Sequence, residues 1–185
     1  MPCLANDRQQ QGFTLLEVLV VVFIVGVIAT MFTLAVGVAG GVDRELRQET
    51  ERLETLIHLA LEDSTFQARE LGIRFYPQSY EFSVWSRGQI ADPTDDTWIQ
   101  IEDEVLAPRK LNKSFGFELE IEGRSVVLEN SAKDVEKSYR PQIFIFSSGD
   151  ISDAFVVRIR DRVARRSYTL DVATDGTTEI TRDDK

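Results

Sequence analysis

Hydrophobic positions form an unbroken run near the start of this chain. Val18 to Val42 are 25 consecutive residues without a charged side chain. As a helix they would extend about 37 Å at ~1.5 Å per residue, enough to cross a hydrocarbon core of roughly 30 Å. A secretory signal peptide needs only about 7 to 15 apolar residues after a basic start. The length of the run, preceded by one base (Arg8) and one acid (Asp7), therefore favours a retained membrane-spanning helix over residues 13–42.

Beyond residue 42 the apolar positions follow a helical repeat. From Asp43 to Arg69, small and apolar residues recur at spacings of three, four and seven, opposite a face rich in glutamate. The stripe consists of Leu46, Leu53, Ile57, Ala60, Leu61, Ser64 and Ala68. Such a pattern is typical of a helix that packs one face against a sheet. We expect residues 43–71 to continue the membrane helix as one long spine.

After Gly72 the pattern alternates between apolar and polar residues, which predicts strands. The predicted strands are Ile73–Tyr76, Tyr80–Trp85, Phe115–Ile121, Ser125–Leu128, Gln142–Phe146, Phe155–Arg160, Ser167–Val172 and Thr177–Ile180. Turn residues separate several of them, at Pro77–Ser79, Glu122–Gly123 and Ser147–Asp150. Because no helical repeat intervenes, we expect an α+β fold, with the long N-terminal helix packed on an antiparallel β-sandwich over residues 72–185. Ala91–Trp98 and Ser131–Arg140 have no clear period and are predicted to be surface loops.

One acidic residue, Glu17, borders the apolar run. An ionised carboxylate inside a membrane helix costs about 2.5 to 3.5 kcal/mol on insertion scales, so such a residue either has a partner or lies at the headgroup level. The sequence around it is Gly12-Phe13-Thr14-Leu15-Leu16-Glu17, followed by the apolar run. This arrangement resembles the N-terminal signal of type IV pilins and of the pseudopilins of type II secretion systems.

The resemblance implies a pilin-like fold and a specific order of processing. A prepilin peptidase would cleave between Gly12 and Phe13, remove residues 1–12 as a leader, and leave Phe13 to be N-methylated. Glu17 of one subunit would then pair with the new amine of a neighbouring subunit inside a filament. A buried ion pair is strongly penalised when one partner is missing or out of register. We therefore expect Glu17 to specify assembly and to have no catalytic role.

Three later stretches of the sequence narrow this resemblance to one family of pseudopilins. Gln67–Ile73, Tyr80–Phe82 with Trp85 nearby, and Pro141–Asp150 resemble the type II secretion system protein H family of minor pseudopilins. This implies a single-pass protein of the bacterial inner membrane with a periplasmic C-terminal domain, incorporated at or near the tip of a pseudopilus that exports folded proteins. The implied partners are the minor pseudopilins I, J and K, the major pseudopilin, the prepilin peptidase and, before assembly, inner membrane lipid. The alternative is a minor type IV pilin involved in pilus assembly or DNA uptake.

The charge of the chain helps to separate these functions. Its 31 acidic and 21 basic residues give a net charge of −10. Nucleic-acid binding depends on phosphate neutralisation, so an acidic chain is a poor general binder. The exception is one arginine cluster, which in alternating strand positions is more typical of a solvated face than of a DNA site. Its members are Arg158, Arg160, Arg162, Arg165 and Arg166.

The remaining chemistry favours a structural protein without a cofactor. The chain has one histidine, His58, and one cysteine, Cys3, which lies in the expected leader. It contains no nucleophile elbow, phosphate loop or dinucleotide fingerprint. Two acidic groups could in principle offer oxygens to calcium, but neither has the twelve-residue loop pattern with its central glycine. These groups are Asp92, Asp95 and Asp96, and Glu102, Asp103 and Glu104. We expect no enzymatic activity and no metal.

Overall fold

The computed structural model describes residues 15–87, 97–130, 140–163 and 165–183, without the side chains of 31–40. The chain divides into two units, Met1–Gly41 and Val42–Lys185, and each is described separately. The only helix in the described residues, α1 (Leu15–Gln67), begins in the first unit and ends in the second. All ten strands of the described part belong to the second unit, which we call the globular unit.

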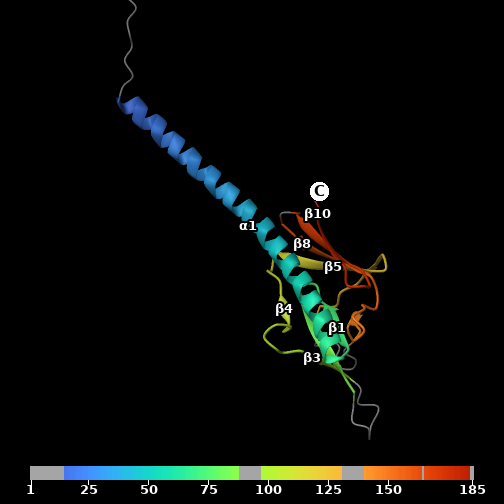
Figure 1. Cartoon of the computed structure of the whole chain (residues 1–185). Coiled ribbons are helices and arrows are strands. Elements are labelled where there is room, and N and C mark those ends of the chain that lie inside the picture. The colour runs from blue at the N-terminus through green and yellow to red at the C-terminus, as the bar shows by residue number, and fades with distance from the viewer. Residues whose placement is uncertain (1–14, 88–96, 131–139, 164, 184–185) are drawn as a thin grey trace, which may run out of the picture. The chain divides into compact units, whose positions relative to one another are not determined.

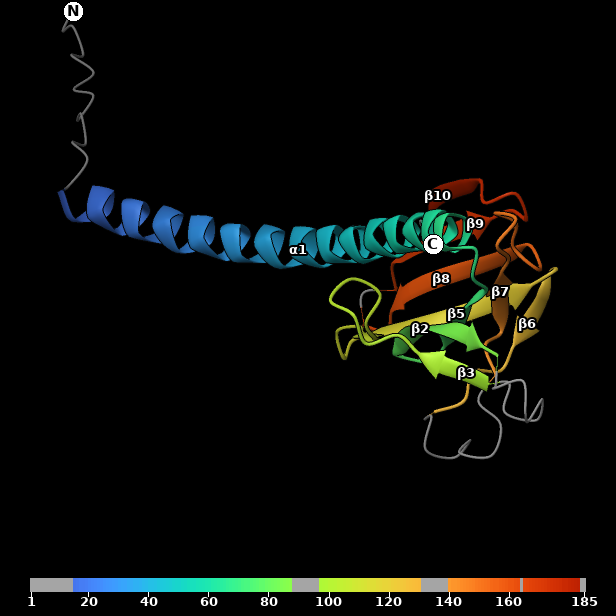
Figure 2. The same ribbon diagram turned by 60° about the horizontal axis from the view of Figure 1, so that its bottom comes forward.

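The strands form two antiparallel sheets. Sheet A has the order β3-β2-β1-β7, with β4 also paired to β2. Its strands are β1 (Leu71–Phe75), β2 (Ser79–Ser86), β3 (Thr97–Gln100), β4 (Arg109–Lys110) and β7 (Ile143–Ile145). Sheet B has the order β10-β9-β8-β5-β6. Its strands are β5 (Phe115–Ile121), β6 (Arg124–Val126), β8 (Phe155–Asp161), β9 (Ser167–Val172) and β10 (Thr178–Asp183). Figures 1 and 2 show these strands beside the C-terminal part of α1.

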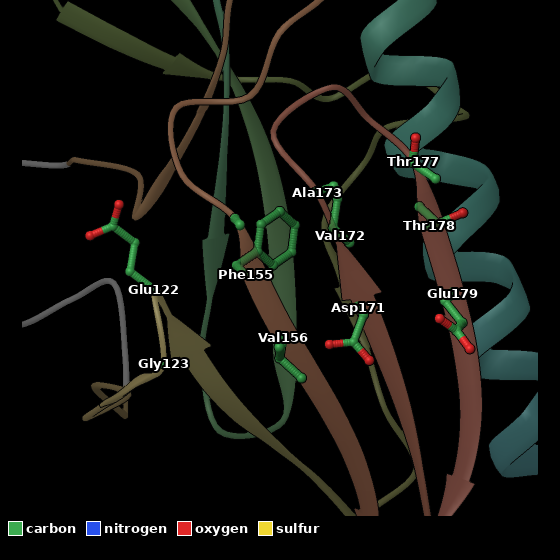
Figure 3. Close-up of a pocket in the computed structure, with 11 residues that line it drawn as sticks. Glu122, Gly123, Phe155, Val156, Asp171, Val172, Ala173, Thr177, Thr178 and Glu179 are labelled. Carbon is green, nitrogen blue, oxygen red and sulfur yellow. The ribbon is translucent and has the colours of Figure 1, made fainter.

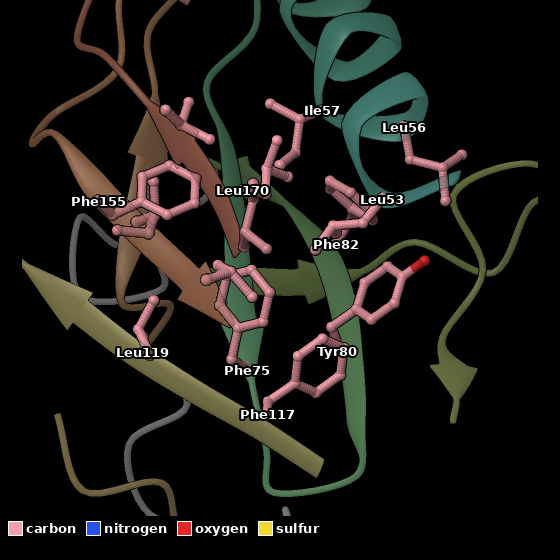
Figure 4. Packing of buried hydrophobic residues seen from close by; sticks show 14 of the residues in the cluster. Leu53, Leu56, Ile57, Phe75, Tyr80, Phe82, Phe117, Leu119, Phe155 and Leu170 are labelled. Atoms are coloured by element: carbon pink, nitrogen blue, oxygen red, sulfur yellow. The ribbon is translucent and has the colours of Figure 1, made fainter. Parts of the chain in front are cut away.

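A single hydrophobic core joins the two sheets to α1. Phe75 of sheet A lies edge-on to Phe117 of sheet B, with ring centroids 5.6 Å apart. Leu53 and Ile57 of α1 are fully buried in the same cluster, and Figure 4 shows them facing Phe82 and its neighbours. The predicted α+β arrangement, a helix packed on an antiparallel sandwich, is thus confirmed.

Most residues of the apolar stripe predicted between Asp43 and Arg69 lie on the buried face of α1. Leu46, Ala60 and Ser64 are fully buried together with Leu53 and Ile57. Leu61 is only half-buried and Ala68 is exposed. The buried face is also wider than expected, because it includes Thr50 and Leu56. The Thr50 hydroxyl is accommodated there because it donates a hydrogen bond of 2.9 Å to the carbonyl oxygen of Leu46.

The helix ends earlier than the sequence repeat indicates. It stops at Gln67, before the expected end at Arg69, and β1 already begins at Leu71, inside the segment 43–71 assigned to the spine. Ala68 adopts a left-handed backbone (φ 50°), and the Arg69 amide donates to the Ser64 carbonyl at 3.1 Å. This is the hydrogen-bond pattern of a Schellman cap. The boundary was placed wrongly because the cap carries alanine instead of the usual glycine.

Most predicted strands are present, with ends shifted by a few residues. The ranges of β5 and of β9 agree with the prediction. The predicted turn at Glu122–Gly123 is also confirmed, since both residues have positive φ, as a two-residue hairpin turn requires. The short strands β3 and β4 were not predicted, and the expected loop Ala91–Trp98 is wrong at residues 97 and 98, which belong to β3. Residues 91–96 and 131–139 of the two expected loops lie outside the described residues.

Candidate assembly segment and charged surface clusters

The first part of α1 exposes its apolar side chains on every side. Between Leu15 and Ile28, twelve large apolar side chains are each 42 to 91% exposed. Because the exposed positions follow one another without a polar face, this is a helix that is hydrophobic all round. Monomeric soluble proteins rarely expose a continuous apolar surface of this extent. The segment therefore requires an apolar environment that the chain itself does not supply.

Glu17 lies in the first turn of this helix, at the N-terminal edge of the exposed apolar surface. A carboxylate in this position is favoured by the partial positive charge of a helix N-terminus. The other two residues of the expected processing site, Gly12 and Phe13, lie outside the described residues. Glu17 is thus the one member of the predicted assembly site whose position the structure gives.

In the part of the chain that the structure describes, no helical stretch is long and apolar enough to cross a membrane. The expected span over residues 13–42 includes two residues, 13 and 14, that are not described, and the side chains of 31–40 are not described either. The membrane span stays a prediction from the sequence.

Asp43, one residue into the globular unit, connects α1 to sheet B. Its Oδ2 accepts a hydrogen bond of 3.4 Å from the Tyr168 hydroxyl and lies 3.5 Å from Nη1 of Arg182. Arg166 approaches Oδ1 at 4.0 Å. Burial, followed by the neighbouring Asp43 charge, raises the pKa of Tyr168. Sequence reasoning missed this cluster because Asp43 of α1 is more than 120 residues away in the chain from its partners, which lie in β9, directly before β9 and in β10.

Two members of the arginine cluster, Arg158 and Arg160 of β8, are paired with acidic residues of sheet B. Arg158 lies 3.3 Å from an oxygen of Glu118 and 3.1 Å from Oδ2 of Asp183, and Arg160 lies 3.5 Å from Glu118. A hydrogen bond from the Thr169 hydroxyl, followed by contact with Arg158, lowers the pKa of Asp183, so this carboxylate remains charged at neutral pH. Phosphate groups would have to compete with these carboxylates. These two arginines have the features of a solvated strand face.

The acidic groups singled out in the sequence do not form a metal site in the described part of the chain. Asp103 uses Oδ1 to accept the backbone amides of Val105 and Leu106, at 2.9 and 2.6 Å, and so caps a turn. Asp92, Asp95 and Asp96 lie outside the described residues. No group of three or more histidine, cysteine or acidic residues among the described ones could hold a metal ion.

A hollow of about 570 Å³ lies at the ends of β8, β9 and β10. Figure 3 shows its three carboxylates, Glu122, Asp171 and Glu179, on separate strands or turns and pointing in different directions. They do not converge on one point, so the hollow lacks the geometry of a cation site.

His58, the sole histidine, is exposed on α1. Its Nε2 lies 3.3 Å from Oγ1 of Thr178, which also donates a hydrogen bond of 2.7 Å to Glu54. These contacts connect α1 to β10. His58 therefore has a structural position between the helix and the sheet.

Sequence reasoning also missed buried polar residues on the outer face of sheet A. The Arg74 guanidinium is almost fully buried, donates 2.9 Å to Glu129 and 3.2 Å to the Arg140 carbonyl, and so joins β1 to the segments that flank residues 131–139. Beside it, the Tyr76 hydroxyl donates a hydrogen bond of 2.6 Å to buried Glu81. Arg74 and Glu81 occupy paired positions of β1 and β2, a cross-strand match of opposite charges that could have indicated this cluster.

Comparisons with known proteins agree with the N-terminal motif and with the fold. The family described as "Prokaryotic N-terminal methylation motif" matches residues 7–33. The chain is 31% identical to type II secretion system protein H of Aeromonas hydrophila, over 91% of this chain and 90% of the relative. It is 30% identical to the protein of the same name from Pseudomonas aeruginosa, over 91% and 93% of the two chains.

Solved structures resemble the fold at lower identity. The crystal structure of the minor pseudopilin EpsH from the type II secretion system of Vibrio cholerae aligns with a TM-score of 0.59 at 14% identity, over 75% of this chain and 96% of that one. The solution structure of Escherichia coli GspH aligns with a TM-score of 0.55 at 15% identity, over 75% and 89% of the two chains.

Proposed function

Because this chain belongs to the type II secretion system protein H family, and is thus a minor pseudopilin, we propose that it is a non-catalytic subunit at or near the tip of the pseudopilus, required for the export of folded proteins across the outer membrane. The observation that carries this proposal is the exposed apolar surface of α1 between Leu15 and Ile28. A surface of this kind must be covered by lipid or by other protein chains.

The two coverings correspond to two stages of the subunit. Before assembly, inner membrane lipid surrounds residues 13–42, with the globular unit in the periplasm. During assembly, the same side chains pass from lipid to the helices of neighbouring subunits, namely the major pseudopilin and the minor pseudopilins I, J and K. Lipid tails and the side chains of neighbouring helices are equally hydrophobic. Helix association in the membrane is therefore driven by van der Waals packing and specific polar contacts.

Processing at Gly12 precedes assembly in this scheme. A prepilin peptidase cleaves the Gly12–Phe13 bond and releases the amine of Phe13, which is then methylated. Glu17 pairs with that amine on a neighbouring subunit, and the pair selects the register of the two helices. The family match over residues 7–33 includes all three residues and supports this assignment.

The test compares a deletion strain with the same strain complemented by the parental chain or by Glu17→Val. Exoproteins in the medium and uptake of labelled DNA are measured separately. We expect the deletion to retain exoproteins in the periplasm and to leave DNA uptake normal. Glu17→Val should be cleaved normally but fail to restore secretion, whereas Glu17→Asp, which keeps the charge, should restore part of it. Normal secretion in the deletion strain would refute the proposal.

The same assay distinguishes the alternative role in DNA uptake. Loss of uptake with normal secretion would favour the DNA-uptake role and make the arginine cluster, Arg158 to Arg166, the first surface to mutate. The pairing of Arg158 and Arg160 with Glu118 and Asp183 argues against that outcome.

A further inference from the structure

An exposed aromatic side chain marks the C-terminal end of α1. Phe66, in the last turn of the helix, is 91% exposed. In the described part of the globular unit, only Val127 is a large apolar residue with equal exposure. Phe66 does not belong to the apolar repeat that packs on the core. The core of the globular unit therefore leaves the Phe66 ring accessible to a partner.

A hollow of about 670 Å³ lies beside Phe66. Leu59 and Leu61 of α1 line it together with two glycines from separate loops, Gly149 and Gly176. Gly176 has a φ of 82°, and a Cβ atom placed there would lie 2.8 Å from a methyl group of Leu61. The glycine is thus required both for the backbone conformation and for the close approach to Leu61. Helix and loops meet here and leave an apolar concavity with an aromatic ring at its border.

The border of this hollow is acidic. Glu62, Asp63 and Asp175 contribute side chains to it. Asp63 is paired with Arg69, whereas Glu62 is exposed. Hydrogen bonds from Thr177 lower the pKa of Asp175, so its carboxylate stays ionised at neutral pH. The last turn of α1 contains no basic residue, and the C-terminus of a helix itself carries partial negative charge. The apolar surface is therefore bordered by two acidic side chains, Glu62 and Asp175, that have no basic residue beside them in the lining.

From these features we infer that Phe66 and the adjoining hollow form the surface on which a neighbouring pseudopilus subunit docks, one that presents an apolar side chain bordered by lysine or arginine. The inference rests on the proposed function and deepens it by assigning a contact surface. An apolar centre with a charged border is the usual anatomy of a protein interface, and a buried aromatic residue at its centre commonly contributes much of the affinity. The acidic border selects a basic partner and disfavours a second copy of this chain, whose surface offers the same acidic border.

The test uses the full-length chain, coexpressed with the other pseudopilins of the same secretion system and purified from membranes in mild detergent. The amount of each pseudopilin recovered with Phe66→Ala is compared with the parental amount. We expect recovery of one pseudopilin to fall by about tenfold or more, as the loss of one buried aromatic side chain predicts. Phe66→Leu, which keeps an apolar side chain, should recover substantially more than Phe66→Ala.

Two matched variants separate docking from general effects. Val127→Ala truncates an equally exposed apolar residue directly after β6 and should leave recovery unchanged. Glu62→Lys should weaken recovery, whereas Glu104→Lys, an equal charge change at another exposed position, should not. Because Phe66 is exposed, the unfolding midpoint of the globular unit should stay the same in Phe66→Ala.

The outcomes distinguish this inference from the proposed function. Equal recovery with Phe66→Ala and the parental chain overturns the docking surface alone. So does an effect confined to self-association, measured by the recovery of a second, differently tagged copy. If the parental chain recovers no pseudopilin and its deletion leaves secretion intact, the proposed function fails and the surface loses its assigned partner with it.

Discussion

The two halves of α1 are both rich in aliphatic residues, but only the second half buries them against other parts of the same chain. Between Leu15 and Ile28 the side chains are exposed all round the helix, whereas Leu46, Leu53 and Ile57 are fully buried in the core of the globular unit. In the second half, acidic and basic residues occupy the opposite face and form pairs such as Arg47 with Glu51 at 2.7 Å.

The difference shows that the pattern of apolar residues, more than their number, determines what covers a helix. A repeat of three and four residues concentrates apolar side chains on one face, which the sheets of the same chain can cover. A continuous run leaves no face for water, so the covering must come from lipid or from other chains. One helix thus combines a segment that packs into the globular unit with a segment whose apolar side chains the chain itself leaves uncovered.

The largest expected effect comes from the same truncation in the two halves. Ile57 is fully buried and Ile24 is 50% exposed. Ile57→Ala should lower the free energy of unfolding of the globular unit by about 2–5 kcal/mol, because it removes buried methyl groups and leaves a cavity. Ile24→Ala should change it by less than about 0.5 kcal/mol. The measurement is denaturant unfolding in detergent, followed by the fluorescence of Trp85 and Trp98.

Ile24→Ala should instead affect association of the chain with membranes and with its partners. The comparison between the two halves would break down if Ile24→Ala destabilised the globular unit as much as Ile57→Ala does. It would also break down if Ile57→Ala left unfolding unchanged.

A second pair of variants compares glycines of the two units. A Cβ atom on Gly72 of β1 would lie 2.7 Å from Cβ of Pro141, whereas one on Gly26 of α1 would meet nothing within 4 Å in the chain itself. Gly72→Ala should therefore cost about 1–3 kcal/mol, as overpacking of a filled site does. Gly26→Ala should leave the unfolding of the globular unit unchanged. Differential scanning calorimetry of both variants measures the two effects, and a neutral Gly72→Ala would mean that Pro141 moves freely.

Much of the globular fold could be predicted because its elements obey local patterns. The ranges of β5 and β9 follow from alternation, and the Glu122–Gly123 turn follows from its residue types. The strands β3 and β4 could not be predicted, because they are short, mostly exposed and held by pairing with β2. Their formation depends on a neighbouring strand, which local sequence does not record.

The candidate sites also differ in whether the sequence alone reveals them. Glu17 is recognisable from sequence because its significance lies in adjacent residues, an apolar run and a preceding Gly-Phe. The docking surface at Phe66 is not recognisable, since it requires the three-dimensional meeting of α1 with loops near Gly149 and Gly176. The Asp43 cluster was missed for the same reason. Features that combine distant segments become visible only in the folded chain.

The last comparison concerns two buried tyrosines and includes the smallest expected effect, that of Tyr80→Phe at pH 7. Tyr80 is 1% exposed, and among the described residues its hydroxyl has no hydrogen-bond partner. Tyr76, by contrast, donates to Glu81. Tyr76→Phe should cost about 1–3 kcal/mol because it removes a partner of a buried carboxylate. Tyr80→Phe should leave the free energy of unfolding at pH 7 within about 1 kcal/mol of the parental value or raise it, since the ring contacts remain.

Alkaline unfolding sharpens the contrast, because burial raises the pKa of Tyr80 from 10.0 to about 12. The folded state thus favours the protonated phenol, so its contribution is fully present below pH 10 and is lost as the pH rises towards 12. A shift of this size corresponds to roughly 2–3 kcal/mol. Tyr80→Phe has no proton to lose, so its denaturant midpoint should fall less than the parental midpoint between pH 10 and 12. Equal decreases in the two proteins would show that the Tyr80 hydroxyl reaches solvent or a polar partner.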